Sequence, residues 1–293
     1  MKSEALNSGI TMVCLVGEQP VANLLPVRHC LPARVILVYS ERTKQVSQNL
    51  QQLIAKAAEV SSHKLDVYNL NSVKTRLGEI VSNDEPLLFN ITGGTKTMAL
   101  AAFMLAKQYQ RPFCYLQSEG GKSLLASYDF NCEEIHLIEE TEIAETLTID
   151  DYLRVHGMTY CLTREIEALE QQVFDCLKPH VSEVLVGVGC GTLELDLVIR
   201  CGNQVGIAEV KTGRAAQRKT GIDQLSTATQ REFLGTYTTR FLIVDRELPP
   251  NNRELALAHN INVIELVEDR SNGLSEGDCE KLILGVRKGL GCN

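Results

Sequence analysis

Short apolar runs alternate with amphipathic stretches along the first half of the chain. The apolar runs have the length of strands and lie at Met12–Gly17, Val35–Tyr39, Leu65–Leu70 and Pro86–Ile91. Between the second and third runs, apolar residues recur at helical spacing across Glu41–Glu59. Continuous apolar strands separated by helices are typical of a parallel sheet that is covered on both faces.

The same alternation continues to about residue 140. We expect a helix over Met98–Tyr109, a strand over Pro112–Gln117 and a further strand over Ser123–Tyr128. The pattern predicts a Rossmann-like, doubly wound α/β domain over residues 1–140. Residues 141–159 are more polar and contain no strong strand, so we interpret them as a connector.

A second α/β pattern occupies residues 160–293. A helix is expected over Glu165–Leu177, where apolar residues recur on one face. The elements expected after it are strands at Glu183–Val188, Leu193–Arg200 and Gln204–Val210, a helix at Ile222–Phe233, a strand at Arg240–Val244, a helix at Asn251–His259, a strand at Ile261–Leu266 and a last helix from Glu276. The second half therefore predicts a separate α/β domain.

Composition narrows the class of protein. The 293 residues are 44% hydrophobic, yet no apolar run approaches the roughly 20 residues that a membrane span needs. The polar stretch Met1–Ser8 lacks a signal-peptide pattern, so we expect a cytoplasmic protein without a membrane partner. Of the ten cysteines, Cys14, Cys114 and Cys176 lie in apolar stretches, and no CxxC pair exists. We therefore expect reduced core thiols rather than disulfides or a zinc site.

The charge distribution bears on nucleic acids. A formal net charge of −8 argues against a protein that coats duplex nucleic acid by bulk electrostatics. It remains compatible with an enzyme that has one local basic patch. Four cations, Lys211, Arg214, Arg218 and Lys219, lie close together in the second half. They form either a solvated loop or a groove for substrate phosphates.

Two carboxylates and a lysine are expected to converge in the second domain. Glu194 and Asp196 share one face of a predicted strand, and Glu209 and Lys211 share one face of the next. The short turn at Cys201–Asn203 indicates that the two strands form a hairpin. The hairpin would bring Asp196 beside Glu209.

This grouping suits metal-assisted phosphodiester hydrolysis. Adjacent carboxylates repel one another, and a divalent cation such as Mg²⁺ or Mn²⁺ would hold both in the ionised form. A lysine beside them can orient a water molecule or offset charge on the phosphate. Glu170, on the preceding helix, is the expected third metal ligand beside Asp196 and Glu209. The alternative is that these carboxylates simply face solvent on an edge hairpin.

Together these residues resemble the PD-(D/E)xK nuclease core. The resemblance rests on Glu170, Asp196 and the Glu209-x-Lys211 pair, on a helix followed by a hairpin. Leu195-Asp196 stands where the superfamily name has Pro-Asp. Gln224, on the helix after the hairpin, matches a glutamine that recurs in that superfamily and is a further expected catalytic residue. The resemblance implies a restriction-endonuclease-like α/β domain.

A glycine-containing turn lies between a strand and a helix in the first domain. In the segment Asn90–Met98, Gly93 and Gly94 would let the backbone approach a ligand closely, and a helix N-terminus favours an anion. Thr92, Thr95 and Lys96 add hydrogen-bond donors. The spacing of a P-loop is absent. A purely structural turn is the alternative.

The end of the first strand meets the same edge of the predicted sheet, and it carries Gly17, Gln19 and Asn23. The segments VGEQPVANLLPV and NITGGTKTM together resemble the CRISPR-associated Rossmann-fold (CARF) domain of type III CRISPR ancillary nucleases. The resemblance implies a homodimer that senses a cyclic oligoadenylate, in particular cyclic tetra-adenylate, and cleaves a nucleic-acid substrate when it is bound. The residues carried over to the ligand are Gly17, Gln19, Asn23, Thr92, Gly93, Gly94, Thr95 and Lys96.

Other interpretations stay open at this point. One is a ligand-sensing regulator with an inactive nuclease fold, although Asp196, Glu209 and Lys211 are present. A nicotinamide-binding oxidoreductase is disfavoured because no GxGxxG follows the first strand. Longer relatives have extra sequence between sensor and nuclease, where this chain has only residues 141–159. The sequence leaves open whether DNA or RNA is cut, the ring size of the ligand, and whether the sensor degrades it.

Overall fold

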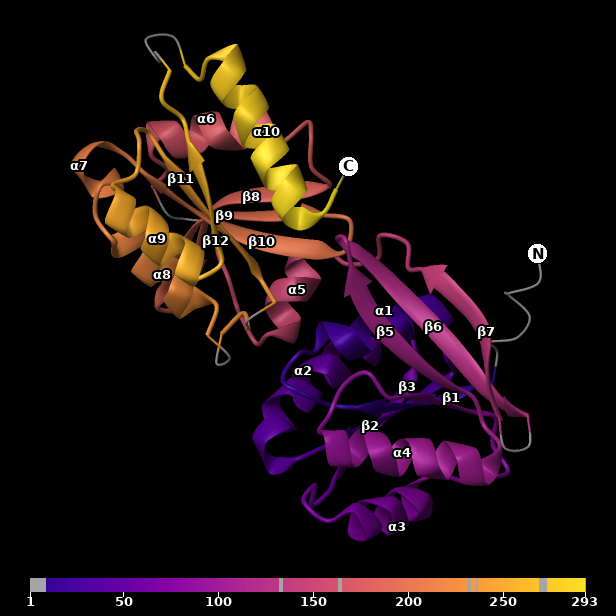
Figure 1. The fold of residues 1–293 in the computed structure, drawn as a ribbon. Helices are drawn as coiled ribbons and strands as arrows, with labels where there is room; N and C mark the ends of the chain where they lie inside the picture. The colour runs from indigo at the N-terminus through magenta and orange to yellow at the C-terminus, as the bar shows by residue number, and fades with distance from the viewer. Residues whose placement is uncertain are drawn as a thin grey trace. The chain divides into compact units, whose positions relative to one another are not determined.

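The computed structural model describes residues 9–131, 134–162, 165–230, 233–235, 237–268 and 273–292 (Figure 1). These residues form two compact units. The N-terminal unit comprises the described residues up to Thr146 together with Val155–Gly157. The C-terminal unit comprises Leu147–Arg154 and the described residues from Met158 onward. The expected connector is thus divided between the units, and it contains a helix, α5 (Ile149–Val155).

The N-terminal unit contains a seven-stranded sheet with the order β3-β2-β1-β4-β5-β6-β7. Its strands are β1 (Thr11–Leu15), β2 (Arg34–Tyr39), β3 (Glu59–Lys64), β4 (Leu87–Asn90), β5 (Phe113–Glu119), β6 (Lys122–Asn131) and β7 (Glu134–Glu142). The strands from β3 to β5 pair in parallel, and β5, β6 and β7 are antiparallel neighbours. The helices are α1 (Val21–Cys30), η1 (Glu41–Thr43), α2 (Lys44–Ile54), α3 (Leu70–Ile80) and α4 (Lys96–Tyr109). The doubly wound α/β prediction is confirmed, with an antiparallel extension.

The strand order reverses direction between β1 and β4. The chain runs from β1 outward to β2 and β3, and then returns to the other side of β1 as β4. Helices α3 and α4 pack on the face that carries Val13, Leu15 and Phe89. Crevices at the carboxyl ends of strands form at such reversal points, which makes the ends of β1 and β4 the place to look for a ligand.

The predicted third strand was misplaced. The strand is Glu59–Lys64, and residues 65–69 form a loop that leads into α3. Because β3 lies at the edge of the sheet, its side chains are only partly covered, and no apolar run marks it. Leu65 and Val67 are buried in the core but belong to the loop. Burial alone therefore did not identify the strand.

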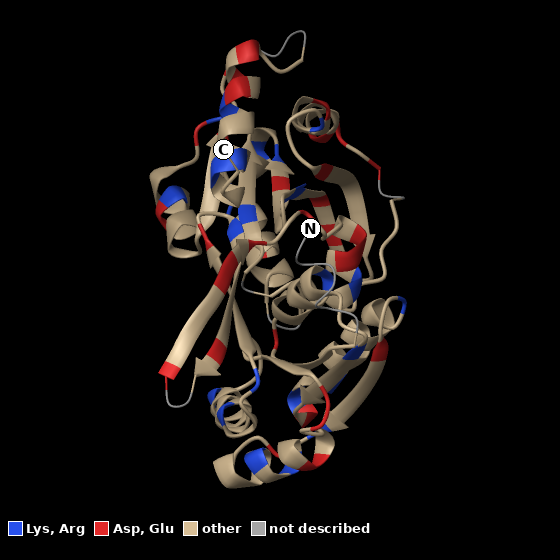
Figure 2. Ribbon diagram, turned by 90° about the vertical axis from the view of Figure 1, so that its right-hand side faces the viewer, with Lys and Arg blue, Asp and Glu red and all other residues tan. Residues whose placement is uncertain are grey.

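The opposite edge strand, β7, was not predicted either. Nearly all of its side chains are exposed, and four of them are acidic: Glu134, Glu139, Glu140 and Glu142. Asp and Glu are drawn red in Figure 2, and red segments lie along the β6–β7 hairpin. Charges on an edge strand discourage pairing with a further strand.

The C-terminal unit contains a five-stranded sheet with the order β12-β11-β10-β9-β8. Its strands are β8 (Glu183–Cys190), β9 (Leu193–Cys201), β10 (Gln204–Lys211), β11 (Thr239–Val244) and β12 (Ile261–Glu265). Strands β8, β9 and β10 are antiparallel, whereas β10, β11 and β12 are parallel. The helices are α6 (Ala168–Leu177), α7 (Gly213–Ala216), α8 (Thr220–Ala228), α9 (Pro250–Ala258) and α10 (Glu276–Leu290). The predicted elements of this half are all present with shifted ends.

The two faces of this sheet have different roles. Helices α6 and α10 pack on the face that carries Leu197, Ile199 and Val210. Because side chains alternate along a strand, Asp196 and Glu209 point to the opposite face. Helix α8 lies over that opposite face, where its residue Gly221 is in contact distance of Lys211.

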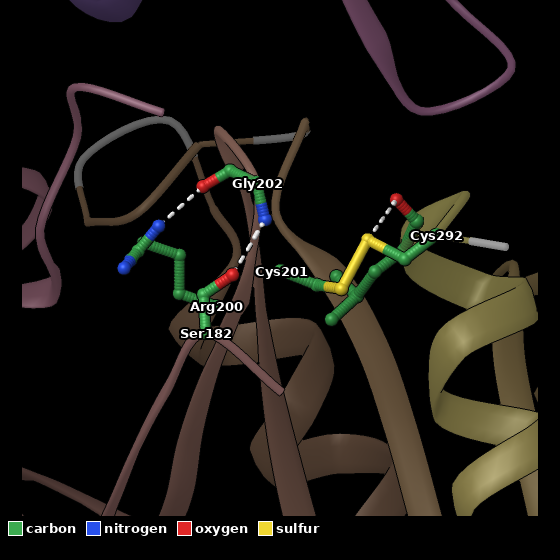
Figure 3. Close-up of a disulfide and its surroundings, with 6 residues drawn as sticks. Ser182, Arg200, Cys201, Gly202 and Cys292 are labelled. Atoms are coloured by element: carbon green, nitrogen blue, oxygen red, sulfur yellow. Dashed lines mark hydrogen bonds between the residues drawn. A yellow bond between two sulfur atoms is a disulfide. The ribbon is translucent and has the colours of Figure 1, made fainter. Parts of the chain in front are cut away.

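Two disulfides correct the expectation of reduced thiols. Cys176 on α6 is bonded to Cys279 on α10, with 6.1 Å between their Cα atoms. Cys201 at the end of β9 is bonded to Cys292, just after α10, and Gly202 nearby accepts a hydrogen bond from Arg200 (Figure 3). Both pairs are about a hundred residues apart in sequence, so only the fold brings them together. Cys14 and Cys114 are buried free thiols, as expected.

No described helix is long and apolar enough to cross a lipid bilayer.

Candidate active site and ligand site

The β9–β10 hairpin positions the carboxylates as predicted. Its ladder runs from the Cys201–Gln204 pair to the Leu197–Ala208 pair. Beyond that pair, the Val210 amide donates to a side chain rather than to the backbone of β9. It donates a hydrogen bond of 2.7 Å to Asp196 Oδ2. This bond fixes the Asp196 carboxylate against β10.

Lys211 joins the two carboxylates. Its Nζ atom lies 2.7 Å from Glu209 Oε2 and 3.4 Å from Asp196 Oδ2. Asp196 and Glu209 are 3% and 1% exposed, so this is a buried cluster of two acids and one base. The structure therefore brings together three of the five predicted catalytic residues.

The cluster contains two carboxylates and only one ammonium group. The pKa of the Glu209 carboxyl is raised to about 8, mainly by burial and secondly by the nearby Asp196 carboxylate. The ammonium group of Lys211 lowers this pKa and so opposes both effects. Burial disfavours the charged form of Lys211, yet the two carboxylates outweigh it and raise its pKa. One ammonium group thus compensates two carboxylates only partly.

These residues suit a divalent cation. A magnesium ion typically uses one or two protein carboxylates and takes its other ligands from water and substrate phosphates. Asp196 and Glu209 supply two such carboxylates. In the described part of the chain, no group of three or more His, Cys, Asp or Glu side chains is arranged to hold a metal. Asp196 and Glu209 are thus the two predicted ligands that the described structure brings together, and the third, Glu170, stays a prediction.

Glu170, the expected third ligand, takes part in the N-terminal cap of its own helix. It is 2% exposed and occupies the first turn of α6. Its Oε2 atom accepts a bond of 3.4 Å from the Glu167 amide in a capping box. Because α6 packs on the face opposite to Asp196 and Glu209, its role as a metal ligand stays a prediction.

Gln224 and the basic residues lie around the same face. Gln224 is exposed on α8 and lines a cavity together with Glu194 of β9. Arg214 and Arg218, between β10 and α8, are exposed. Their exposure is compatible with both of the roles considered for the basic run.

In the N-terminal unit, the loops after β1 and β4 touch through their glycines. A Cβ atom on Gly17 would come within 2.9 Å of the Gly94 amide nitrogen. A Cβ atom on Gly93 would lie 2.2 Å from the carbonyl oxygen of Leu15, and Gly94 has a φ of +74°. No other residue fits these positions, so the Gly-Gly pair is required by close packing of the two loops.

A buried amide network holds the two loops together. Asn23 is fully buried, and its Nδ2 atom donates to the Leu15 carbonyl at 2.9 Å. Asn90, also fully buried, donates to Asn23 Oδ1 at 3.1 Å and accepts from the Thr92 hydroxyl at 2.6 Å. Thr92 also accepts from the Leu116 amide at 2.8 Å. In this structure the hydrogen bonds of Asn23 and Thr92 hold the loops after β1 and β4 in place.

Sequence reasoning had not singled out Asn90. The available signal was a polar residue at the end of an otherwise apolar strand, where a buried side chain needs polar partners. Asn90 stabilises the loop that carries the predicted ligand residues through its hydrogen bonds with Thr92.

The remaining predicted ligand residues are exposed or partly exposed. Thr95 is the N-cap of α4, and its hydroxyl accepts from the Met98 amide at 3.2 Å. Lys96, the first residue of α4, is exposed. Gly17 and Gln19 are partly exposed beside it in the loop after β1. A cation and a helix N-terminus thus lie at the crevice between β1 and β4.

Comparison with known proteins supports the assignment of the N-terminal unit. Residues 11–152 match the family model described as the Card1 CARF domain. A comparison of the sequence with curated proteins gives no match.

Three solved structures have a similar fold. Can2 from Sulfobacillus thermosulfidooxidans, solved in complex with cyclic tetra-adenylate, has a TM-score of 0.73 at 18% identity and covers 96% of each chain. Protein VC1899 from Vibrio cholerae has a TM-score of 0.73 at 14% identity, covering 97% of this chain and 99% of that one. A type III CRISPR defence DNA nuclease activated by cyclic oligoadenylate has a TM-score of 0.68 at 16% identity, covering 94% of this chain and 52% of that one. The N-terminal part of the chain, residues 11–152, is therefore similar to the Card1 CARF domain.

Proposed function

We propose that this protein is a metal-dependent endonuclease that is activated when its CARF domain binds a cyclic oligoadenylate, and that it acts in type III CRISPR antiviral defence. The buried cluster of Asp196, Glu209 and Lys211 is the observation that carries the proposal. A cluster of this kind has no evident structural purpose on the face of a sheet, and its composition is that of a phosphodiesterase site.

The residues of the cluster have distinct roles in this mechanism. Asp196 and Glu209 would hold a Mg²⁺ or Mn²⁺ ion, which would supply Lewis-acid polarisation of the scissile phosphate. The Val210 amide keeps the Asp196 carboxylate in place. Lys211 would orient the attacking water and stabilise charge on the phosphate oxygens.

The N-terminal unit supports the choice of activator. Lys96 and the N-terminus of α4 favour an anion at the crevice between β1 and β4. Can2, which shares the fold, was solved with cyclic tetra-adenylate, and another protein of this fold is described as activated by cyclic oligoadenylate. Cyclic tetra-adenylate is therefore the activator that we propose.

We further propose that the active form is a homodimer. Lys96, Leu100 and Met104 follow one another at four-residue spacing on α4 and so lie on one face of it. Leu100 and Met104 are 55% and 40% exposed, which leaves an apolar stripe that continues from the ligand residues. A second copy of the chain would cover this stripe and bring two Lys96 side chains to one symmetric ligand.

The rival proposal is a ligand-sensing regulator with an inactive nuclease fold. Burial of two carboxylates and a lysine in contact is costly, and a protein that only senses a ligand gains nothing from it in this unit. The geometry therefore favours an active enzyme.

Cleavage assays test the proposal. Single- and double-stranded DNA and RNA would be incubated with the protein and Mg²⁺ or Mn²⁺, with and without cyclic tetra-adenylate. We expect cleavage that requires both the metal and the cyclic nucleotide. Cleavage that persists in EDTA would contradict the metal mechanism, and ligand binding without any cleavage would support the regulator.

A further inference from the structure

A cavity lies beside the Asp196–Glu209–Lys211 cluster, in the same unit. Its volume is about 350 Å³, within the range of small-molecule sites. Its polar lining comes from Thr192 before β9, from Glu194 at the start of β9, and from Asp223, Gln224 and Thr227 on α8. Gln224 is also a predicted catalytic residue, and the mechanism above gives the other lining residues no role.

The distance between the cavity and the Asp196–Glu209–Lys211 cluster is about the spacing between neighbouring nucleotides in a strand. Glu194 precedes Asp196 by two residues on β9, so both side chains point to the same face, about 6.5–7 Å apart along the strand. Helix α8 begins over Lys211: a Cβ atom on Gly221 would lie 3.3 Å from Lys211 Cγ. A nucleotide strand whose phosphate lies at the cluster would therefore bring a neighbouring nucleotide to the cavity.

The lining favours a base rather than a phosphate. Glu194 and Asp223 are both carboxylates, which repel phosphate oxygens and can only accept hydrogen bonds when ionised. The exposed Arg214 and Arg218 precede α8 and offer phosphates a more favourable path. Leu193 and Ala228 add apolar walls suited to the face of a flat ring.

The hydrogen-bond donors and acceptors of the cavity determine which edge of a base it can bind. Asp223 is partly engaged by Lys219, 3.8 Å away, and the Thr227 hydroxyl donates to the Asp223 carbonyl at 2.9 Å. Glu194 is exposed at the mouth of the cavity and is the carboxylate best placed to accept from a ligand. Gln224 can both donate and accept. The cavity therefore offers an acceptor for an amino group beside a donor for a ring carbonyl or ring nitrogen.

We propose that this cavity binds the base next to the scissile phosphate and selects bases that carry an exocyclic amino group, with Glu194 as the acceptor. Cytosine fits, because its amino group donates to a carboxylate. Thymine and uracil have a carbonyl oxygen at the same position, which faces Glu194 unfavourably. The inference rests on the proposed nuclease function and adds a sequence preference to it.

The test compares two single-stranded substrates that are identical except that every cytosine in one is a thymine, or a uracil for RNA, in the other. Wild type, Glu194→Gln and Glu254→Gln would be assayed with Mg²⁺ and cyclic tetra-adenylate, and cleavage positions sequenced. Glu254→Gln makes the same change on α9, away from the cavity. We expect wild type and Glu254→Gln to favour the cytosine substrate by about tenfold at one position flanking the cut. Glu194→Gln, whose amide can also donate to a carbonyl, should lose most of that preference.

Binding of the same oligonucleotides in Ca²⁺, followed by fluorescence anisotropy, separates this inference from the proposed function. Cleavage by the wild type without a base preference that depends on Glu194 would overturn the pocket and leave the nuclease intact. A cytosine preference in binding that Glu194→Gln removes, without cleavage by any form, would support the pocket and contradict the nuclease. Absence of both binding and cleavage would overturn both.

Discussion

The ammonium group of Lys211 reaches back along its own strand to Glu209, with 2.7 Å between Nζ and Oε2. The contact exists because residues two apart on a strand share a face. Lys211 also lies 3.4 Å from Asp196, so a single lysine is in contact with both carboxylates of the cluster. A divalent cation would compete with it for the same two acids and release it toward the substrate.

Lys211→Met tests that role. Methionine keeps much of the length and the apolar stem of the side chain but removes the charge, so we expect the cleavage rate to fall about 100-fold while metal binding persists. Calorimetry with Mn²⁺ and single-turnover cleavage measure the two effects separately. A rate equal to that of the wild type would mean that Lys211 only balances charge.

Asp196→Asn and Glu209→Gln remove a metal ligand with little change of shape. In Asp196→Asn, the carbonyl oxygen of the new side chain can still accept from the Val210 amide, so thermal unfolding should stay close to that of the wild type. We expect cleavage to fall by about a thousandfold or more in either variant, because the cation loses one of two protein ligands. Cleavage at the wild-type rate in either variant would contradict the assigned ligand pair.

Lys96→Ala tests the sensor. Removing one cation from an anion site should raise the ligand concentration for half-maximal activation by roughly tenfold, equivalent to about 1.4 kcal/mol. Because Lys96 lies in the N-terminal unit, the variant should recover most of the wild-type rate at saturating ligand. A variant that binds ligand normally but cannot be activated would assign Lys96 to transmission of the signal rather than to binding.

The proposed symmetric site makes a separate prediction of stoichiometry. A cyclic tetranucleotide can have twofold symmetry, so one ligand should bind per two chains in calorimetry. A ratio of one ligand per chain would contradict the shared site.

Gly94→Ala should destabilise the N-terminal unit more than Gly120→Ala does. Both glycines have positive φ, so alanine is strained by about 1 kcal/mol at either position. At Gly94 the new Cβ would also meet Leu15 Cβ at 2.9 Å, whereas at Gly120 nothing lies within 4 Å. We expect a loss of about 2–3 kcal/mol against about 1 kcal/mol in denaturant unfolding. Equal losses would mean that the loops after β1 and β4 can separate without cost.

The Cys176–Cys279 disulfide should contribute to the stability of the C-terminal unit. It closes a loop with a sequence separation of 103 residues, and the chain entropy that it removes from the unfolded state corresponds to about 4.7 kcal/mol. The double replacement Cys176→Ser with Cys279→Ser should lower the unfolding free energy by about that amount. Addition of dithiothreitol should destabilise the wild type more than this variant, which retains only the Cys201–Cys292 bond. An equal response to dithiothreitol in both proteins would exclude a stabilising role for the first bond.

Much of the fold followed from local patterns. The hairpin that carries Asp196, Glu209 and Lys211 could be predicted because strand alternation and a short turn determine which side chains meet. The edge strands β3 and β7 could not, because partly exposed strands have no apolar run to mark them.

The remaining differences come from contacts between distant parts of the chain. The two disulfides depend on where α10 packs, and nothing near Cys176 in the sequence indicates Cys279. The burial of Asn23 and Asn90 depends on how the loops after β1 and β4 meet.

The central claim is that ligand binding in one unit turns on metal-dependent cleavage in the other. The measurement that tests it most directly is the initial cleavage rate in Mg²⁺ as cyclic tetra-adenylate is titrated into the wild type and into Glu209→Gln. The account predicts a saturable rise in the wild-type rate and no rise in the variant, although both bind the ligand. A wild-type rate that does not depend on the ligand, or an equal rise in Glu209→Gln, would contradict it.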